Sequence, residues 1–154
     1  MPSINWLVKQ ITADYPAISL QATSQASHWS PTTHTIFYNP SEQHAEWVLL
    51  HELAHGILQH DIYKRDIELL AIERDAWQYA TEVLALRYDM TIDEEFIEDH
   101  LDSYRDWLHA KSSCPNCNLN GVEIKTRSYR CLACGQTWQV NEARTCRLQR
   151  YNQT

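Results

Sequence analysis

The sequence predicts an α+β fold organised in two parts. Along the first 111 residues, apolar residues follow helix-like spacing in a short first segment, then strand-like spacing, and then helix-like spacing again. All five cysteines lie beyond that point. The charge changes there too, because residues 1–111 hold 7 Lys/Arg and 18 Asp/Glu, a net charge of −11, whereas residues 112–154 hold 6 and 2, a net charge of +4. We therefore expect an acidic domain at 1–111 and a small basic C-terminal module at 112–154.

The first elements are a helix and three strands. Ile4, Leu7 and Ile11 recur at helical spacing before Pro16, which predicts a short amphipathic helix. Strand candidates are residues 17–23, 26–30 and 34–38, the last two being joined by a turn-prone Ser-Pro-Thr-Thr segment. Together they predict a small antiparallel sheet.

Three longer helices are expected next. Ser41 is a suitable N-cap for a helix that runs to about His60 and has one broad apolar side. A second helix covers roughly residues 66–88, where apolar residues are spaced by threes and fours. A third begins at the capping-box pattern Thr91-x-x-Glu94.

The composition narrows the class of protein. Hydrophobic residues make up 44% of the chain and there are only 3 glycines, which favours a packed core over a disordered or collagen-like chain. No apolar run approaches eighteen residues, and the first ten residues do not read as a secretory signal. We therefore expect no membrane association and a cytoplasmic location.

The helix predicted after Ser41 carries the pattern His51-Glu52-Leu53-Ala54-His55. Two histidines four positions apart lie on one helix face and can bind the same metal ion, while Glu52 can take a proton from an activated water molecule. This pattern predicts a catalytic zinc site with peptide-hydrolysing chemistry. The alternative is a pair of surface histidines beside a structural glutamate.

A catalytic zinc ion needs a third protein ligand. The acidic and histidine candidates are His60, Asp61, Asp66, Glu68, Glu73 and Asp75. Because His60 and Asp61 lie more than a turn beyond His55, the next helix is expected to supply the ligand. Asp75 is followed by the small Ala76, which lets helices approach closely.

Three segments carry a resemblance to a known family. The sequences TIFYN at 35–39, VLLHELAHG at 48–56 and ERDA at 73–76 resemble the ImmA/IrrE-type zinc metallopeptidases. The resemblance spans roughly residues 34–86. It implies that residues 1–111 form a zincin-like minimal metallopeptidase domain, active as an endopeptidase on an intracellular protein such as a regulator or repressor. It also implies that the strand 35–38 is an edge that pairs with an extended substrate.

The resemblance also implies a third ligand. In the family the second acidic residue of a Glu-x-Glu-Ala segment binds zinc, and here that position is Asp75, one methylene shorter. Glu73 is the alternative, and since two residues along a helix turn a side chain by about 200°, only one of them can face the metal. Tyr79, one turn after Asp75, is a candidate donor to the developing oxyanion.

The C-terminal module contains two Cys-x-x-Cys pairs. At this interval they predict a four-thiolate structural zinc site in a zinc ribbon, with Tyr129 and Trp138 as its small core. The alternatives are two disulfides or a redox pair. Cys146 is left over and is expected to be a free thiol. The predicted ligands are Cys114, Cys117, Cys131 and Cys134.

The module is also basic, and its aromatic residues Tyr129 and Trp138 are interleaved with cations, as in a nucleic-acid-binding surface. A zinc ion with four thiolates carries a charge of −2, which reduces the positive charge of the module. The remaining positive charge also suits docking onto the acidic domain. The two interpretations stay open. The cations are Lys125, Arg127, Arg130, Arg144, Arg147 and Arg150.

The leading hypothesis is a zinc metalloendopeptidase with one catalytic and one structural Zn²⁺, acting on a protein substrate. One alternative is a SprT-like protease of DNA-associated proteins, which the ribbon favours and the lack of a third histidine disfavours. The other is an inactive zinc-stabilised module that binds protein or nucleic acid. The oligomeric state is not predicted.

Overall fold

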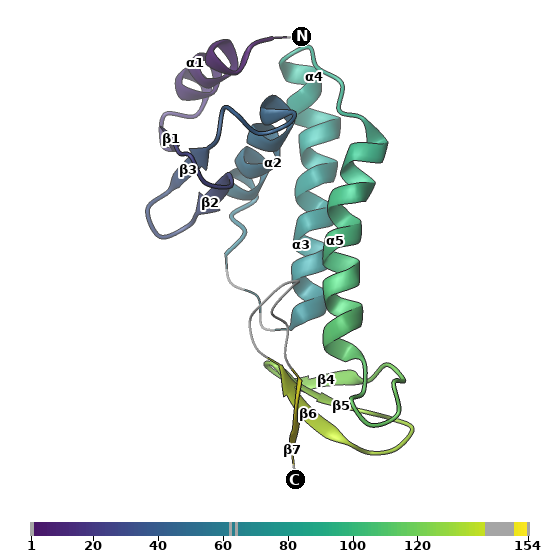
Figure 1. Ribbon diagram of the computed structural model, residues 1–154. Coiled ribbons are helices and arrows are strands. Elements are labelled where there is room, and N and C mark those ends of the chain that lie inside the picture. The colour runs from purple at the N-terminus through teal and green to yellow at the C-terminus, as the bar shows by residue number, and fades with distance from the viewer. Residues whose placement is uncertain (1, 62, 64, 141–149, 154) are drawn as a thin grey trace. The chain divides into compact units, whose positions relative to one another are not determined.

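The computed structural model describes residues 2–61, 63 and 65–140, and the backbone of 150–153 (Figure 1). Small sheets combine with helices, which confirms the α+β class. No helix in the described ranges is long and apolar enough to cross a membrane. The elements are α1 (Ile4–Asp14), β1 (Ser19–Ala22), β2 (His28–Ser30), β3 (Thr35–Tyr38), α2 (Ala45–Ile57), α3 (Asp66–Tyr79), η1 (Ala80–Leu84), α4 (Ala85–Arg87), α5 (Glu94–Ser112), β4 (Val122–Lys125), β5 (Ser128–Arg130), β6 (Thr137–Val140) and β7 (Arg150–Gln153).

The chain divides into two compact units. The first contains residues 1–61 and 72–97, and the second contains residues 62–71 and 98–154. Helices α3 and α5 each contribute residues to both units. The domain boundary expected at residue 111 rests on charge and cysteine content, and it stays a prediction.

The sheet of the first unit is mixed, so the expected antiparallel sheet is wrong in one strand pair. Its order is β1-β3-β2, with β1 parallel and β2 antiparallel to β3. The most apolar strand takes the centre, where Ile36 is fully buried. Strand β1 pairs with β3 instead of its sequence neighbour β2, and this pairing is parallel. A strand with partners on both sides is not an edge, which also corrects the expected role of residues 35–38.

Helix α2 begins four residues later than its predicted N-cap. His44 occupies the N-cap position in the left-handed region, with φ of 54°, and makes no side-chain capping bond. Ser41 instead donates its backbone N–H to Asn39 in a turn. Glu42 accepts hydrogen bonds from the backbone and hydroxyl of Ser27, which fixes this turn to the loop before β2.

The helix predicted at 66–88 is interrupted by a π-helical turn. Segment η1 lies between α3 and α4, and Thr81 bonds back to the carbonyl of Trp77 within it. Helix α5 begins at Glu94, later than the predicted capping box. Asp93 replaces Thr91 at its start, because its carboxylate accepts a hydrogen bond from the N–H of Glu95.

The second unit contains an antiparallel sheet in the order β4-β5-β6-β7. Tyr129 and Trp138 stack with ring centroids 5.8 Å apart and are almost completely buried. Both pack in a small cluster with Cys114, Cys131 and Val140. These rings therefore form the core of the C-terminal module, as predicted.

A buried polar cluster joins helices and strands of the second unit. Asp66, at the start of α3, receives hydrogen bonds from Nζ of Lys111 at 3.2 Å and from the hydroxyl of Tyr129. Its own backbone N–H donates to Glu123 on β4 at 3.1 Å. Lys111 is only 2% exposed, and Asp66 compensates its charge.

Candidate metal centres

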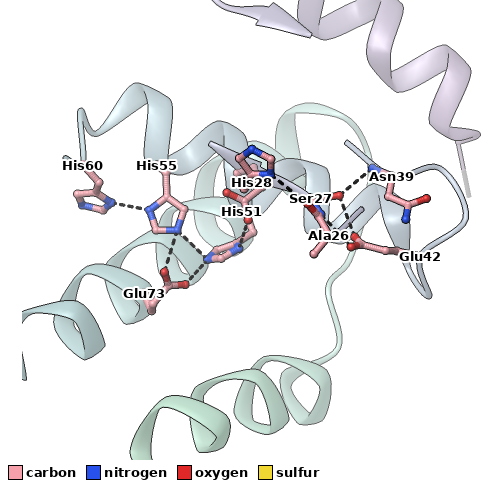
Figure 2. A network of polar contacts seen from close by, with 10 residues as sticks. Ala26, Ser27, His28, Asn39, Glu42, His51, His55, His60 and Glu73 are labelled. Atoms are coloured by element: carbon pink, nitrogen blue, oxygen red, sulfur yellow. Dashed lines mark hydrogen bonds and ion pairs between the residues drawn. The ribbon is translucent and has the colours of Figure 1, made fainter. Parts of the chain in front are cut away.

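The two histidines of the His-Glu-x-x-His pattern face one another on α2. One helical turn separates them, and their Nε2 atoms are 3.1 Å apart (Figure 2). Trp77 of α3 stacks on the ring of His51, with centroids 4.2 Å apart and planes 6° from parallel. Both histidines are 6% exposed. Packing therefore fixes the pair, which excludes the alternative of two surface histidines.

Glu73 of α3 brings a carboxylate to the same point. One of its oxygens lies 2.9 Å from Nε2 of His51 and the other 3.3 Å from Nε2 of His55. Glu73 is 5% exposed. Figure 2 shows the three side chains converging from α2 and α3.

Asp75, the ligand favoured from the sequence, lies elsewhere. Its side chain is 51% exposed and pairs with Arg74 at 3.4 Å. The reason is helical phase: Glu73 points inward, and two further residues turn the next carboxylate by about 200°. Asp75 and Tyr79 instead line a pocket of about 370 Å³ beside the end of α2. The catalytic role expected for Tyr79 stays a prediction.

The surroundings of His51 favour its positively charged form. Burial lowers the pKa of His51, but the carboxylates of Glu52 and Glu73 outweigh it and raise that pKa to about 9. Burial raises the pKa of Glu73, yet His51 and His55 hold it well below its usual value. The buried carboxylates therefore favour a positive charge at His51, such as a proton or a metal ion would supply.

The donor atoms also have the spacing that zinc requires. Ligands bound at 2.0–2.1 Å in a tetrahedron are about 3.3 Å from one another. The three contacts between His51, His55 and Glu73 measure 2.9 to 3.3 Å. The Glu73 oxygen nearest His51 is buried and makes no directed hydrogen bond to the described residues. These side chains fit a zinc ion.

Glu52 lies beside His51, His55 and Glu73 but is not one of the side chains that converge. Its Oε1 is 3.4 Å from Nδ1 of His51, the ring nitrogen on the side away from His55. One donor atom each from Glu52, His51 and His55 lies within 4.8 Å of the others. The Glu52 carboxylate therefore lies beside the ring of His51, and its expected action on a water molecule stays a prediction.

The four cysteines form a second candidate centre. Sγ of Cys114 is 3.6 Å from that of Cys134, and Sγ of Cys117 is 3.5 Å from that of Cys131. A tetrahedral zinc ion with Zn–S bonds of 2.3 Å separates its sulfur ligands by about 3.8 Å. The described cysteines are free thiols, so the disulfide alternative is not supported.

Two matching turns present these cysteines. The residue after each pair, Asn118 or Gly135, adopts a positive φ of 65° or 78° and donates its N–H to the carbonyl of Cys114 or Cys131. The pKa of Cys134 is lowered to about 6 by a backbone hydrogen bond from Gln136 and by the amide of Asn116. A thiolate is the form that binds zinc.

The surface expected for nucleic acid is only partly present. Lys125, Arg127 and Arg130 are exposed. Tyr129 and Trp138 are buried, so these two rings are not available to stack on bases. Cys146, Arg144, Arg147 and the side chain of Arg150 lie outside the described residues.

Comparison with known proteins gives one match. The model of the family described as IrrE N-terminal-like domain, Peptidase_M78, matches residues 15–107. The match includes the whole of α2 and α3 and ends before the first cysteine. No curated protein and no solved structure matches the chain.

Proposed function

Since the chain belongs to the family of IrrE N-terminal-like domains, Peptidase_M78, we propose that it is a zinc-dependent endopeptidase. The observation that carries this proposal is the convergence of two imidazoles and one carboxylate on a single point, with Glu52 beside it. Three protein ligands with a further position open are the arrangement of catalytic zinc sites.

Each side chain has a defined role. His51, His55 and Glu73 hold the zinc ion, and Trp77 keeps the ring of His51 in place. When bound, zinc supplies a Lewis acid that activates water and polarises the peptide carbonyl. Glu52 takes the proton of the attacking water and passes it to the leaving amine. Tyr79 stays a candidate oxyanion donor.

The substrate is an extended segment of a protein, and a regulator or repressor inside the cell is the target class that the family resemblance implies. The strand available to pair with it is β2, the sheet edge that packs on α2. Trp29 of β2 lies against Gly56, where an added Cβ would be 3.2 Å from the indole ring. The free edge of β2 is thus close to the chain position of His55. The cytoplasmic location stays a prediction.

The four cysteines hold a structural zinc ion that stabilises the C-terminal module. Binding of nucleic acid by this module rests on the three exposed cations among its described residues, and steep weakening of binding by salt would test it. The family match favours the proposed peptidase over a SprT-like protease of DNA-associated proteins. The intact Glu52 disfavours an inactive binding module.

The decisive experiment compares wild type with Glu52→Gln. We expect two zinc ions per chain in both proteins, and peptidase activity on unfolded protein or peptide libraries in wild type only. Loss of a general base typically costs 10²- to 10⁴-fold in rate. Full activity in Glu52→Gln, or a wild-type chain whose metal is held by cysteines alone, would overturn the proposal.

A further inference from the structure

The C-terminal end of α2 has a specific capping geometry. His60 donates its backbone N–H to the carbonyl of His55 at 3.0 Å, and Gln59 donates to Gly56 at 3.3 Å. Gln59 adopts a left-handed conformation with φ of 56°. This pair of bonds is a Schellman motif, in which the residue after the left-handed position folds back over the last helical turn.

In Schellman motifs, the residues at the positions of His60 and His55 here frequently also make an apolar side-chain contact. Here both residues are histidines. Nδ1 of His60 lies 2.9 Å from Nδ1 of His55, whereas Glu73 contacts the other ring nitrogen of His55, and Figure 2 shows both contacts. The helix cap therefore places a polar group directly behind a proposed metal ligand.

Two ring nitrogens at 2.9 Å share one proton. Nε2 of His55 can offer its lone pair to a metal ion only if the proton of that imidazole is on Nδ1. His60 must then be the acceptor and carry its own proton on Nε2. In the opposite arrangement the proton of His55 would lie on Nε2 and exclude the metal.

We propose that His60 is a positioning residue of the metal centre, whose Nδ1 accepts the Nδ1–H of His55 and so fixes the tautomer and ring orientation that bind zinc. The proposal rests on the proposed zinc centre, but not on catalysis. Metal-binding histidines usually donate their second N–H to a carboxylate, carbonyl or water, and loss of such a partner commonly weakens metal binding by about 10- to 100-fold. Here the neutral imidazole of His60 is the acceptor for the second N–H of His55.

Two variants of nearly equal size separate hydrogen bonding from packing. His60→Asn keeps an acceptor close to the position of Nδ1, whereas His60→Leu gives the Schellman motif its usual apolar contact and removes the acceptor. Both should fold. Gln59→Gly is the control, because it relieves the left-handed backbone without touching either imidazole.

Zinc affinity of the histidine centre is measured by competition with a chelator on the full chain. Cobalt substitution distinguishes the centres, since only the cysteine site gives intense thiolate charge-transfer absorption. We expect His60→Leu to weaken zinc binding at the histidine centre by about 10- to 100-fold. His60→Asn and Gln59→Gly should stay within a few-fold of wild type. Nitrogen-15 NMR of the zinc-loaded chain should show His60 protonated on Nε2.

Wild-type affinity in His60→Leu, or an Nδ1–H tautomer of His60 in the loaded chain, would overturn this role. Equal weakening by His60→Asn and His60→Leu would also overturn it, because packing alone would then account for the effect. Zinc binding that depends on His60 in a chain without peptidase activity would refute the proposed function and leave this inference standing. A chain that binds metal only through cysteines would refute both.

Discussion

Glu73 and Asp75 are two positions apart on α3 but have different surroundings. Glu73 is buried against both imidazoles, whereas the carboxylate of Asp75 is half exposed. We expect Glu73→Gln to lose zinc from the histidine centre, by more than the roughly 10- to 100-fold typical of an outer hydrogen-bond partner, together with peptidase activity. Metal content by elemental analysis and a peptide-cleavage assay measure both effects.

Asp75→Asn is the matched control for this prediction. It changes the same functional group on the same helix, outside the hydrogen bonds and ion pairs described above for His51 and His55, and should retain two zinc ions and most of the activity. Zinc loss in Asp75→Asn combined with zinc retention in Glu73→Gln would restore the ligand first inferred from the sequence.

The sequence could predict the approach of His51 and His55 because helical spacing alone determines it. It could not decide between Glu73 and Asp75. That choice depends on the rotation of α3, which is set by packing of residues such as Trp77 against α2. His60 was discounted as a ligand, and its Schellman contact was not visible because Gln59, not glycine, occupies the left-handed position.

The types of the secondary-structure elements were more predictable than their limits and partners. Every helix and strand expected in residues 1–111 is present, because each follows from local apolar spacing. The start of α2 was misplaced, since Glu42 bonds to Ser27 fifteen residues earlier instead of joining the first helical turn. The parallel pairing of β1 with β3 is likewise a non-local contact.

The contact between β4 and the start of α3 predicts that the free energy of unfolding depends on pH. Burial and the adjacent carboxylate of Asp66 raise the pKa of Glu123 to about 7. The folded state favours the protonated form of Glu123. The contribution of this side chain to the stability of the fold is therefore complete below its ordinary pKa of 4.5 and is lost as pH rises through about 7. Tyr129 and Lys111 also face Asp66, so they complete this buried group.

Glu123→Gln mimics the protonated side chain at every pH. Relative to wild type, this variant should therefore gain stability between pH 6 and pH 8, by on the order of 1 kcal/mol, because solvent screening reduces the effect of a partly exposed side chain. Thermal unfolding at both pH values measures the difference. Lys125→Gln, an exposed change on the same strand, should show no such trend, and a Glu123→Gln advantage that shrinks with rising pH would contradict the prediction.

The sequence difference between the acidic and the Cys-containing parts of the chain is matched by two separate sets of candidate metal ligands. The histidines and Glu73 all belong to the first compact unit, and the four cysteines to the second. Each set is therefore complete within one unit. It follows that metal can be removed from one centre by mutation without removing any ligand of the other.

The C-terminal module should depend on its metal for folding. Among the described residues, the hydrophobic cluster around its cysteines adds only Tyr129, Trp138 and Val140, whereas a structural zinc site contributes roughly 10–16 kcal/mol of binding free energy near pH 7. Removing metal with a strong chelator should therefore unfold strands β4 to β6, and trypsin should then cleave after exposed cations of the C-terminal module. Mass spectrometry locates the cleavage sites, and circular dichroism should show that most helix remains.

Glu73→Gln, which loses only the histidine-bound metal, should keep the module resistant to trypsin. Resistance of the fully metal-free chain would show that the small core holds these strands without zinc.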